Sequence, residues 1–324
     1  MTYVTTDFTV PYLNFSAEYF LATEKDMGDI FMLWRNEPSV IVGRYQNTYE
    51  EVNLGYTEAN GIHVARRMSG GGTVYHDLGC WEFSFITRDP GYGIDFGRFM
   101  APVAEALSGM GLNVEISGRN DILLFPRGGD RGYKVSGNTQ YKKNGVTVHH
   151  GTLLFDTDIE ELVKSTTPKD YKITSKAIRS VRERVTNIRP NLPQDMTREE
   201  FRDSLASRMT DVSYTLTDDD LAKIKKGAGM FSSPEWIYGK NPAFGIKASV
   251  SASGGMADIG LDVKGGLIAE ASVTGDFFSD FSGDPGECLR GAPFSRDGII
   301  KAFIESGCSI RGIPAEMIAE AVFR

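Results

Sequence analysis

The glycine-rich segment from residue 66 to residue 77 is the first place where this sequence could do chemistry. It reads Arg-Arg-Met-Ser-Gly-Gly-Gly-Thr-Val-Tyr-His-Asp, so three consecutive glycines follow two arginines and a serine. Glycine lets the backbone turn tightly and lets its N–H groups approach an anion closely. Neither a Walker A loop nor a dinucleotide-binding fingerprint is present, because no Gly-Lys-Ser/Thr follows and no helix is expected next. The segment favours an anion-binding loop over the alternative, a hairpin turn flanked by surface arginines.

Two further clusters carry polar groups that could act on the same ligand. One is Arg-Asn-Asp at 119–121, and the other runs from Lys134 to Gly137 and continues as His-His-Gly-Thr at 149–152. Adjacent histidines in a strand point to opposite faces, so we expect one to pack and the other to face a cleft. A solvated, lysine-rich surface loop remains an alternative for residues 134–144, and Asp121 could be an ordinary turn residue.

Composition limits the class of partner. The chain has 324 residues, of which 41% are hydrophobic, and this length predicts two domains. A net charge of -8 gives no electrostatic basis for binding nucleic acid or an anionic membrane. Three widely spaced cysteines without a Cys-x-x-Cys motif support neither a disulfide framework nor a zinc site, and a reducing cytoplasm fits best. We expect no signal peptide in the first twenty residues and no membrane-spanning segment.

The elements that must position these residues alternate between strands and helices in the first half of the chain. Strands are predicted at 62–66, 73–76, 81–85, 114–116, 122–125 and 147–155, and helices at 14–25 and from Asp95 to Leu107. Trp81, Phe83 and Phe85 are expected to share one face of their strand. The pattern predicts a mixed α/β sheet with helices packed on it.

A second, smaller domain is predicted after a segment rich in Ser, Pro, Gly and Asn at 232–242. Helices at 197–209 and 217–226, each with a threonine N-cap, precede this segment. A hairpin with strands at 259–263 and 267–273 follows it, and helices at 296–306 and 314–323 complete an α+β unit. We therefore predict domains at 1–242 and 243–324.

Taken in order, the motifs resemble those of the lipoate-protein ligase A family. They are the glycine-rich segment, Gly-Arg-Asn-Asp at 118–121, Lys-Val-Ser-Gly at 134–137 and His-His-Gly-Thr-Leu-Leu at 149–154. The likeness extends to nearly the whole chain through two further segments, Ser-Pro-Glu-Trp-Ile-Tyr-Gly-Lys-Asn-Pro at 233–242 and Gly-Asp-Phe-Phe at 275–278. The resemblance implies a mixed-sheet catalytic domain of the biotin-ligase type, related to class II synthetase cores, and a small α+β C-terminal accessory domain.

The resemblance also implies a reaction and its partners. Lipoate, and possibly octanoate, would react with ATP and Mg to form lipoyl-AMP and pyrophosphate. The acyl group would then pass to a lysine of an apo lipoyl domain of a 2-oxo-acid dehydrogenase complex or of the glycine-cleavage H protein. Neither nucleic acid nor membrane takes part.

Roles for individual residues follow from the same resemblance. Lys134 would be the catalytic cation that contacts the lipoate carboxylate and the α-phosphate, where charge develops during transfer. Asn120 and Asp121 would lie near phosphate and magnesium, with Asp121 as the Mg ligand. The loop would wrap the acyl-adenylate through Gly70, Gly71 and Gly72, and the remaining pocket residues would be Arg67, Ser69, Thr73, His76, His150 and Thr152, with Gly72 and Thr152 also on the ATP side.

Cys80 departs from the family pattern, in which Tyr-His-Asp-Leu-Gly is usually followed by asparagine. Free cysteine commonly packs as a small hydrophobe, and this is the interpretation we favour. The alternatives are a cofactor-free octanoyltransferase that uses Cys80 as its nucleophile, or a degenerate ligase that only binds lipoyl domains. The accessory domain argues against the first alternative, and the presence of Lys134 and the three glycines argues against the second.

Overall fold

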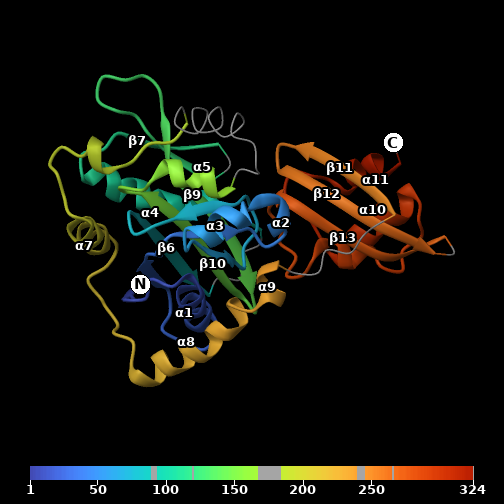
Figure 1. Ribbon diagram of the computed structural model, residues 1–324, viewed down its shortest axis with the longest axis horizontal. Coiled ribbons are helices and arrows are strands. Elements are labelled where there is room, and N and C mark those ends of the chain that lie inside the picture. The colour runs from blue at the N-terminus through green and yellow to red at the C-terminus, as the bar shows by residue number, and fades with distance from the viewer. Residues whose placement is uncertain (89–92, 119, 167–183, 239–244, 265, 324) are drawn as a thin grey trace.

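A seven-stranded mixed sheet is the centre of the larger part of the molecule (Figure 1). The computed structural model describes residues 1–88, 93–118, 120–166, 184–238, 245–264 and 266–323. The strand order is β1 (Thr2–Thr5), β2 (Ile30–Trp34), β6 (Cys80–Thr87), β10 (Val146–Leu154), β9 (Tyr133–Lys143), β8 (Asp121–Leu124) and β7 (Val114–Ser117). Strands β1 and β2 pair in parallel and the other neighbours are antiparallel.

Helices cover both faces of this sheet. The helices α1 (Pro11–Thr23) and α8 (Asp218–Phe231) pack together on one face, and α4 (Phe96–Gly109) and α7 (Arg198–Met209) contact each other on the opposite face (Figure 1). Strand β2 is buried throughout, with Phe31 in the α4 core and Met32 in the α1 core. Because side chains alternate along a strand, one buried strand supplies both cores.

Local sequence signals determine where several helices begin. Thr197 and Thr217 each form a capping box with the residue three positions later, as predicted. Asp95 caps α4, whereas α1 begins at Pro11, three residues before the predicted start, because proline is well accommodated in a first turn.

A second, three-stranded sheet carries the glycine-rich segment. Its order is β4 (His63–Arg66), β3 (Ser39–Val42), β5 (Val74–His76), so the two strands joined by the glycines both pair with β3 and not with each other. The alternative of a plain hairpin turn is therefore wrong. Short helices surround this sheet: α2 (Thr48–Glu51), α3 (Leu54–Ala59), α5 (Ile159–Thr166) and α9 (Pro234–Tyr238).

The alternative of a surface loop at residues 134–144 is also wrong. Strand β9 spans most of this segment and pairs with both β8 and β10. The lysines of this segment lie on β9, which ends at Lys143. Asn144, in the turn that follows, has a φ of 51°. Lys134 is therefore held by its pairing with Leu123 of β8 and by an isolated bridge to Val185, and not by a solvated loop.

The C-terminal part has its own sheet and core. Strands β11 (Ile246–Ala252), β12 (Gly255–Lys264) and β13 (Leu267–Phe277) are antiparallel, and α10 (Arg296–Ser306) and α11 (Ala315–Val322) pack with them. The 3-10 turns at Arg189–Asn191 and Pro285–Leu289 complete the described elements. The predicted hairpin and both predicted helices are confirmed. The predicted domain division after residue 242 falls within 239–244, outside the described residues.

The larger part and the C-terminal part meet at the end of β13 and at Phe278, which follows it. The Tyr45 ring stacks on Phe277 with centroids 4.7 Å apart, and the Gly275 N–H donates to the Tyr45 carbonyl at 2.7 Å. Phe278 is 1% exposed and belongs to the core of the larger part.

Among the described helices, none has the length and apolar character needed to cross a bilayer.

Candidate active site

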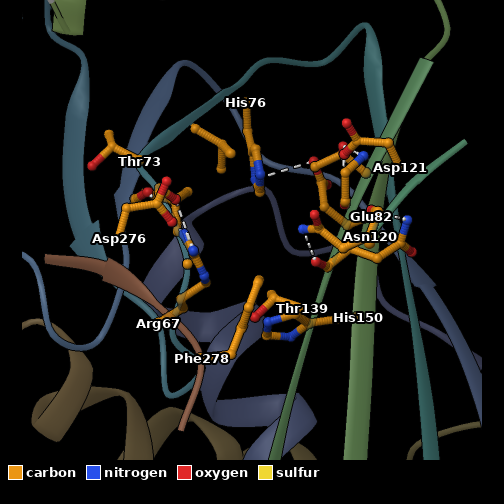
Figure 2. Close-up of a pocket in the computed structure, with 18 of the residues that line it drawn as sticks. Arg67, Thr73, His76, Glu82, Asn120, Asp121, Thr139, His150, Asp276 and Phe278 are labelled. Carbon is orange, nitrogen blue, oxygen red and sulfur yellow. Dashed lines mark hydrogen bonds and ion pairs between the residues drawn. The ribbon is translucent and has the colours of Figure 1, made fainter. Parts of the chain in front are cut away.

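A cavity of about 360 Å³ is lined by residues of both sheets of the larger part, by one residue of α1, and by the end of β13 with the residue that follows it (Figure 2). Its lining consists of Phe15, Trp34, Ile41, Arg67, Gly71, Gly72, Thr73, Val74, His76, Glu82, Asn120, Asp121, Lys134, Gly137, Asn138, Thr139, His150, Gly151, Thr152, Asp276 and Phe278. All three sequence clusters contribute to this list, so the fold brings them to one site.

The glycine loop is folded around the side chain of Arg67. This guanidinium is 5% exposed and donates at 2.7 Å to the carbonyls of both Gly70 and Gly72. Gly71 has a φ of 87°, which requires glycine, and its N–H donates to the Phe277 carbonyl at 2.8 Å. Burial lowers the pKa of Arg67 to about 10, so the group keeps its charge at neutral pH. In this conformation the Gly71 N–H is used by the C-terminal part and not by an anion.

One end of the cavity presents a cation. The Lys134 Nζ lies 2.7 Å from the Asp121 Oδ1, and its side chain is 36% exposed, so a ligand can reach it. The Lys134 side chain runs over Gly137, where an added Cβ would lie only 2.9 Å from Nζ. The Thr152 hydroxyl accepts from the Gly137 N–H at 3.1 Å, and Asn120 donates to the backbone of β9 at 2.6 Å. The strands therefore fix an ammonium group beside a carboxyl and two polar side chains.

The opposite end has a floor of four buried side chains that hydrogen-bond to one another: Glu18, Ser69, Ser84 and His150. His150 contacts the Glu18 Oε1 through Nδ1 at 2.8 Å and the Ser69 hydroxyl through Nε2 at 2.7 Å. The Ser84 hydroxyl donates to the same Glu18 oxygen at 2.6 Å and accepts from the Trp34 indole at 2.9 Å. The lining also contains the apolar side chains of Phe15, Trp34 and Ile41, and the Trp34 ring lies 6.4 Å from the imidazole of His76. Because the polar groups satisfy one another, this end suits an apolar chain.

The two adjacent histidines point in opposite directions, as predicted. His149 lies among phenyl rings on the other face, 4.9 Å from the Phe99 ring and 6.1 Å from the Phe83 ring, and burial lowers its pKa well below the usual value. His150 faces the cavity. This outcome follows from the alternation of side chains along β10.

A second buried histidine, His76, lies beside a buried carboxyl group. Its Nδ1 is 3.0 Å from the Asn36 Nδ2 and 3.1 Å from the Glu82 Oε1. Burial, and then the charge of Arg67, lowers the pKa of His76 to about 3. Burial also raises the pKa of Glu82 well above its usual range. His76 is therefore neutral near pH 7, and burial disfavours the ionised form of Glu82.

The C-terminal part supplies two side chains to the cavity, Asp276 and Phe278. The Phe278 ring lies 5.0 Å from that of Phe96, and an added Cβ at Gly72 would lie 3.3 Å from the Asp276 carboxyl. The charge of Asp276 also partly offsets the effect of burial on the pKa of Arg67. The site is built from both parts of the chain.

Cys80 is fully buried and is not part of the lining. Burial is the main cause that raises the pKa of its thiol well above the usual value. No hydrogen bond joins it to His76 in the described part of the chain. A thiol in these surroundings is a poor nucleophile, so the packing interpretation is favoured.

Most of the predicted site residues line this one cavity. The exceptions are Ser69 and Gly70, which lie behind the lining, where Ser69 supports His150 and Gly70 supports Arg67. Arg119 lies outside the described residues. Sequence reasoning missed Glu18, Trp34 and Glu82. A signal existed for Glu82, because a charged residue between Trp81 and Phe83 must face the opposite side of that strand.

Comparison with known proteins decides the family. A model of the lipoyl protein ligase A/B catalytic domain matches residues 10–210, and a model of the bacterial lipoate protein ligase C-terminus matches residues 241–321. The chain belongs to the lipoate-protein ligase family. It is accordingly an enzyme of the ligase class, and the resemblance inferred from its motifs is confirmed.

Individual relatives agree with this assignment. Lipoate-protein ligase LplJ of Bacillus subtilis is 40% identical over 278 residues, which cover 83% of this chain and 82% of that protein. The crystal structure of P. falciparum LipL1 in complex with lipoate matches with a TM-score of 0.77 and 23% identity, covering 96% and 95% of the two chains. A bipartite lipoate protein ligase of Thermoplasma acidophilum, described with its E2 lipoyl domain, has a TM-score of 0.64 and 26% identity and covers 76% of this chain and 98% of that one. These likenesses confirm the mixed α/β fold with a further C-terminal unit.

Proposed function

We propose that this ligase activates lipoate with ATP to form lipoyl-AMP and then transfers the lipoyl group to a lysine of a lipoyl domain. The observation that carries the proposal is the polarity of the cavity that the three motif clusters line. Lys134, Asn120 and Asp121 gather at one end, and the apolar walls with the paired floor form the other. An acyl chain with a terminal carboxylate has the same polarity.

In the first step, an oxygen of the lipoate carboxylate attacks the α-phosphorus of ATP. A new carboxyl–phosphorus bond forms, the bond to the β-phosphate oxygen breaks, and pyrophosphate leaves. Negative charge approaches negative charge in this step, so a fixed cation lowers the barrier. Lys134 is held in place by Asp121 and by the strand beneath it, and we assign that role to it.

In the second step, the amine of the acceptor lysine attacks the acyl carbonyl. The acyl–phosphate bond breaks, AMP leaves, and the amine gives up a proton as the amide forms. Lys134 would remain near the departing phosphate, and the glycine loop around Arg67 would keep the adenylate away from water.

Magnesium accompanies ATP in this proposal. Magnesium usually keeps several waters and needs only one or two protein carboxylates when nucleotide phosphates are also ligands. Asp121 fits as such a single ligand, and the described residues contain no group of three or more acidic, histidine or cysteine side chains that could hold a metal alone. The ion would supply charge neutralisation at the phosphates.

The acceptor class is taken from relatives. The Thermoplasma ligase is described with an E2 lipoyl domain, and lipoyl domains of 2-oxo-acid dehydrogenase complexes and the glycine-cleavage H protein are our candidate acceptors here. Octanoate is a candidate second substrate. Three free cysteines, two of them buried, are compatible with the cytoplasmic location that we also propose.

Lipoate-dependent exchange of radiolabelled pyrophosphate into ATP tests the first step. We expect exchange with lipoate and none without it. A cysteine-based octanoyltransferase or a binding-only protein would show no exchange, and the raised pKa of Cys80 already argues against the former. Incubation with lipoate, ATP and an apo lipoyl domain, followed by intact-mass analysis, tests the second step.

A further inference from the structure

Glu82 is a buried carboxyl group on the cavity face of the large sheet. It is 2% exposed and pairs across the strands with Thr152, whose hydroxyl contacts Gly137. Gly137 in turn pairs with Asp121. Cross-strand partners carry their side chains on the same face of a sheet. The side chain of Glu82 therefore lies on the face that carries Thr152 and Asp121, at the cation end of the cavity. Figure 2 shows it on the side of Asn120 and Asp121, close to His76.

A chain of hydrogen bonds fixes the protonation of His76. The two amide protons of Asn14 are shared among three acceptors, the Phe8 carbonyl at 3.0 Å, the Arg35 carbonyl at 2.9 Å and the Asn36 Oδ1 at 3.0 Å. The Asn36 amide nitrogen therefore faces the His76 Nδ1, 3.0 Å away. An amide NH2 only donates, so Nδ1 must accept and the imidazole proton resides on Nε2.

The same argument determines the state of Glu82. Its Oε1 lies 3.1 Å from Nδ1, the atom that carries a lone pair. An ionised carboxylate would oppose that lone pair, which the Asn36 amide already uses, whereas a neutral carboxyl can lie beside it without repulsion. Burial favours the neutral form of both groups, and so do the charged or titratable neighbours: Arg67 and His150 for His76, and Asp77 for Glu82.

We propose that Glu82 is a substrate-binding residue of the ligase site, which as a neutral carboxylic acid leaves the His76 Nδ1 lone pair to the Asn36 amide, so that the His76 Nε2–H and the unpaired oxygens of Glu82 serve the bound substrate. In the described residues, His76 Nε2 and both carboxyl oxygens of Glu82 have no hydrogen-bond partner, although the Cys80 thiol lies near Glu82. A buried donor without a partner is costly, and a ligand that satisfies it is bound more tightly. The matching ligand group is an oxygen at the carboxyl end of the acyl substrate.

This inference rests on the proposed function and can be tested apart from it. Glu82→Gln keeps a neutral group with a donor and an acceptor for the ligand, whereas Glu82→Met keeps the length and removes both. The first readout is the tautomer of His76, taken from its imidazole 15N shifts, which needs no activity. The second is the lipoate KM, compared with kcat, in pyrophosphate exchange.

We expect Glu82→Gln to keep the Nε2–H tautomer and the lipoate KM within about threefold, and Glu82→Met to raise KM about tenfold to a hundredfold with a smaller change in kcat. Glu37→Gln is the matched control, because Glu37 contacts His63 at 2.6 Å outside the cavity. It should change neither readout.

Three results would overturn the inference. One is a Glu82→Gln variant as impaired as Glu82→Met, which would mean that an ionised carboxylate is required. Another is an unchanged KM in Glu82→Met. The third is a wild-type or Glu82→Gln protein with the proton of His76 on Nδ1, and this result decides the matter even if Glu82→Met does not fold. Absence of exchange in the wild type would instead contradict the proposed function and leave the tautomer measurement intact.

Discussion

The two ends of the cavity differ in how fully their polar groups are paired. At the floor, Glu18, His150, Ser69 and Ser84 bond to one another and leave no demand on a ligand. At the cation end, His76 Nε2 lacks a partner in the described chain and Lys134 has a single carboxyl contact. A buried polar group that is hydrogen-bonded stabilises the fold. A buried polar group without a partner lowers the free energy of unfolding, and a ligand that bonds to it restores that free energy. The floor should therefore respond to mutation chiefly in stability, and the cation end chiefly in activity.

Lys134→Ala should have the largest effect. Loss of the cation is expected to reduce the rate of adenylate formation about 10²- to 10³-fold, because one preorganised charge is removed from the transition state. The free energy of unfolding should change little, since a partly exposed ion pair contributes about 0–1 kcal/mol. Single-turnover formation of lipoyl-AMP and urea denaturation measure the two quantities.

The matched control for this variant is Lys164→Ala. Lys164 has the same pairing, 2.8 Å from Glu161 with 37% of its side chain exposed, and it lies outside the cavity. It should retain wild-type activity. Near-normal adenylate formation by Lys134→Ala would remove the distinction between the two ends of the cavity.

Glu18→Ala should act mainly on stability. The change leaves the Ser84 hydroxyl and the His150 Nδ1 without their buried acceptor, at a cost of about 1–3 kcal/mol in the free energy of unfolding. A lower urea midpoint with unchanged m-value would show this. A variant with wild-type stability and no affinity for lipoate would assign the floor to substrate recognition.

Gly71→Val should affect both properties, because this residue joins the loop to the C-terminal part. Its φ of 87° costs a β-branched residue about 1–2 kcal/mol. An added Cβ would also lie 3.0 Å from the Phe278 ring and 3.2 Å from the Arg67 guanidinium. Calorimetry should show weaker lipoate binding.

The control for that variant is Gly128→Val. Gly128 has a φ of 76° and no neighbouring atom within 4 Å of an added Cβ, so it isolates the backbone strain from the contacts. Equal lipoate affinities in the two variants would indicate that the glycine loop is a structural turn alone.

Cys80→Ser should have the smallest effect, with activity retained within about threefold, because a buried thiol packs as a small hydrophobe. Cys80 faces the same side of β6 as Glu82 but does not line the cavity. Exchange and transfer assays measure the result. Loss of activity, together with an acyl-thioester detected on the wild type by mass spectrometry, would revive the transferase mechanism.

Several elements could be predicted from the sequence because their determinants are local. The two threonine capping boxes, the alternation of Trp81, Phe83 and Phe85, and the C-terminal hairpin each depend on residues within a few positions of one another. The order of the motifs indicated the family and most of the cavity lining. Local chemistry was sufficient for these features.

The tertiary structure alone decided which groups are paired. Glu18 meets His150 across 132 positions, and Phe278 enters a core whose other members lie between residues 31 and 206. No local pattern encodes such contacts, because they depend on how the sheets and helices pack. The neutral state of Glu82 has the same origin. Its neighbours in sequence place it on a strand, but only burial beside an accepting imidazole nitrogen, in a cavity closed by the C-terminal part, keeps its proton in place.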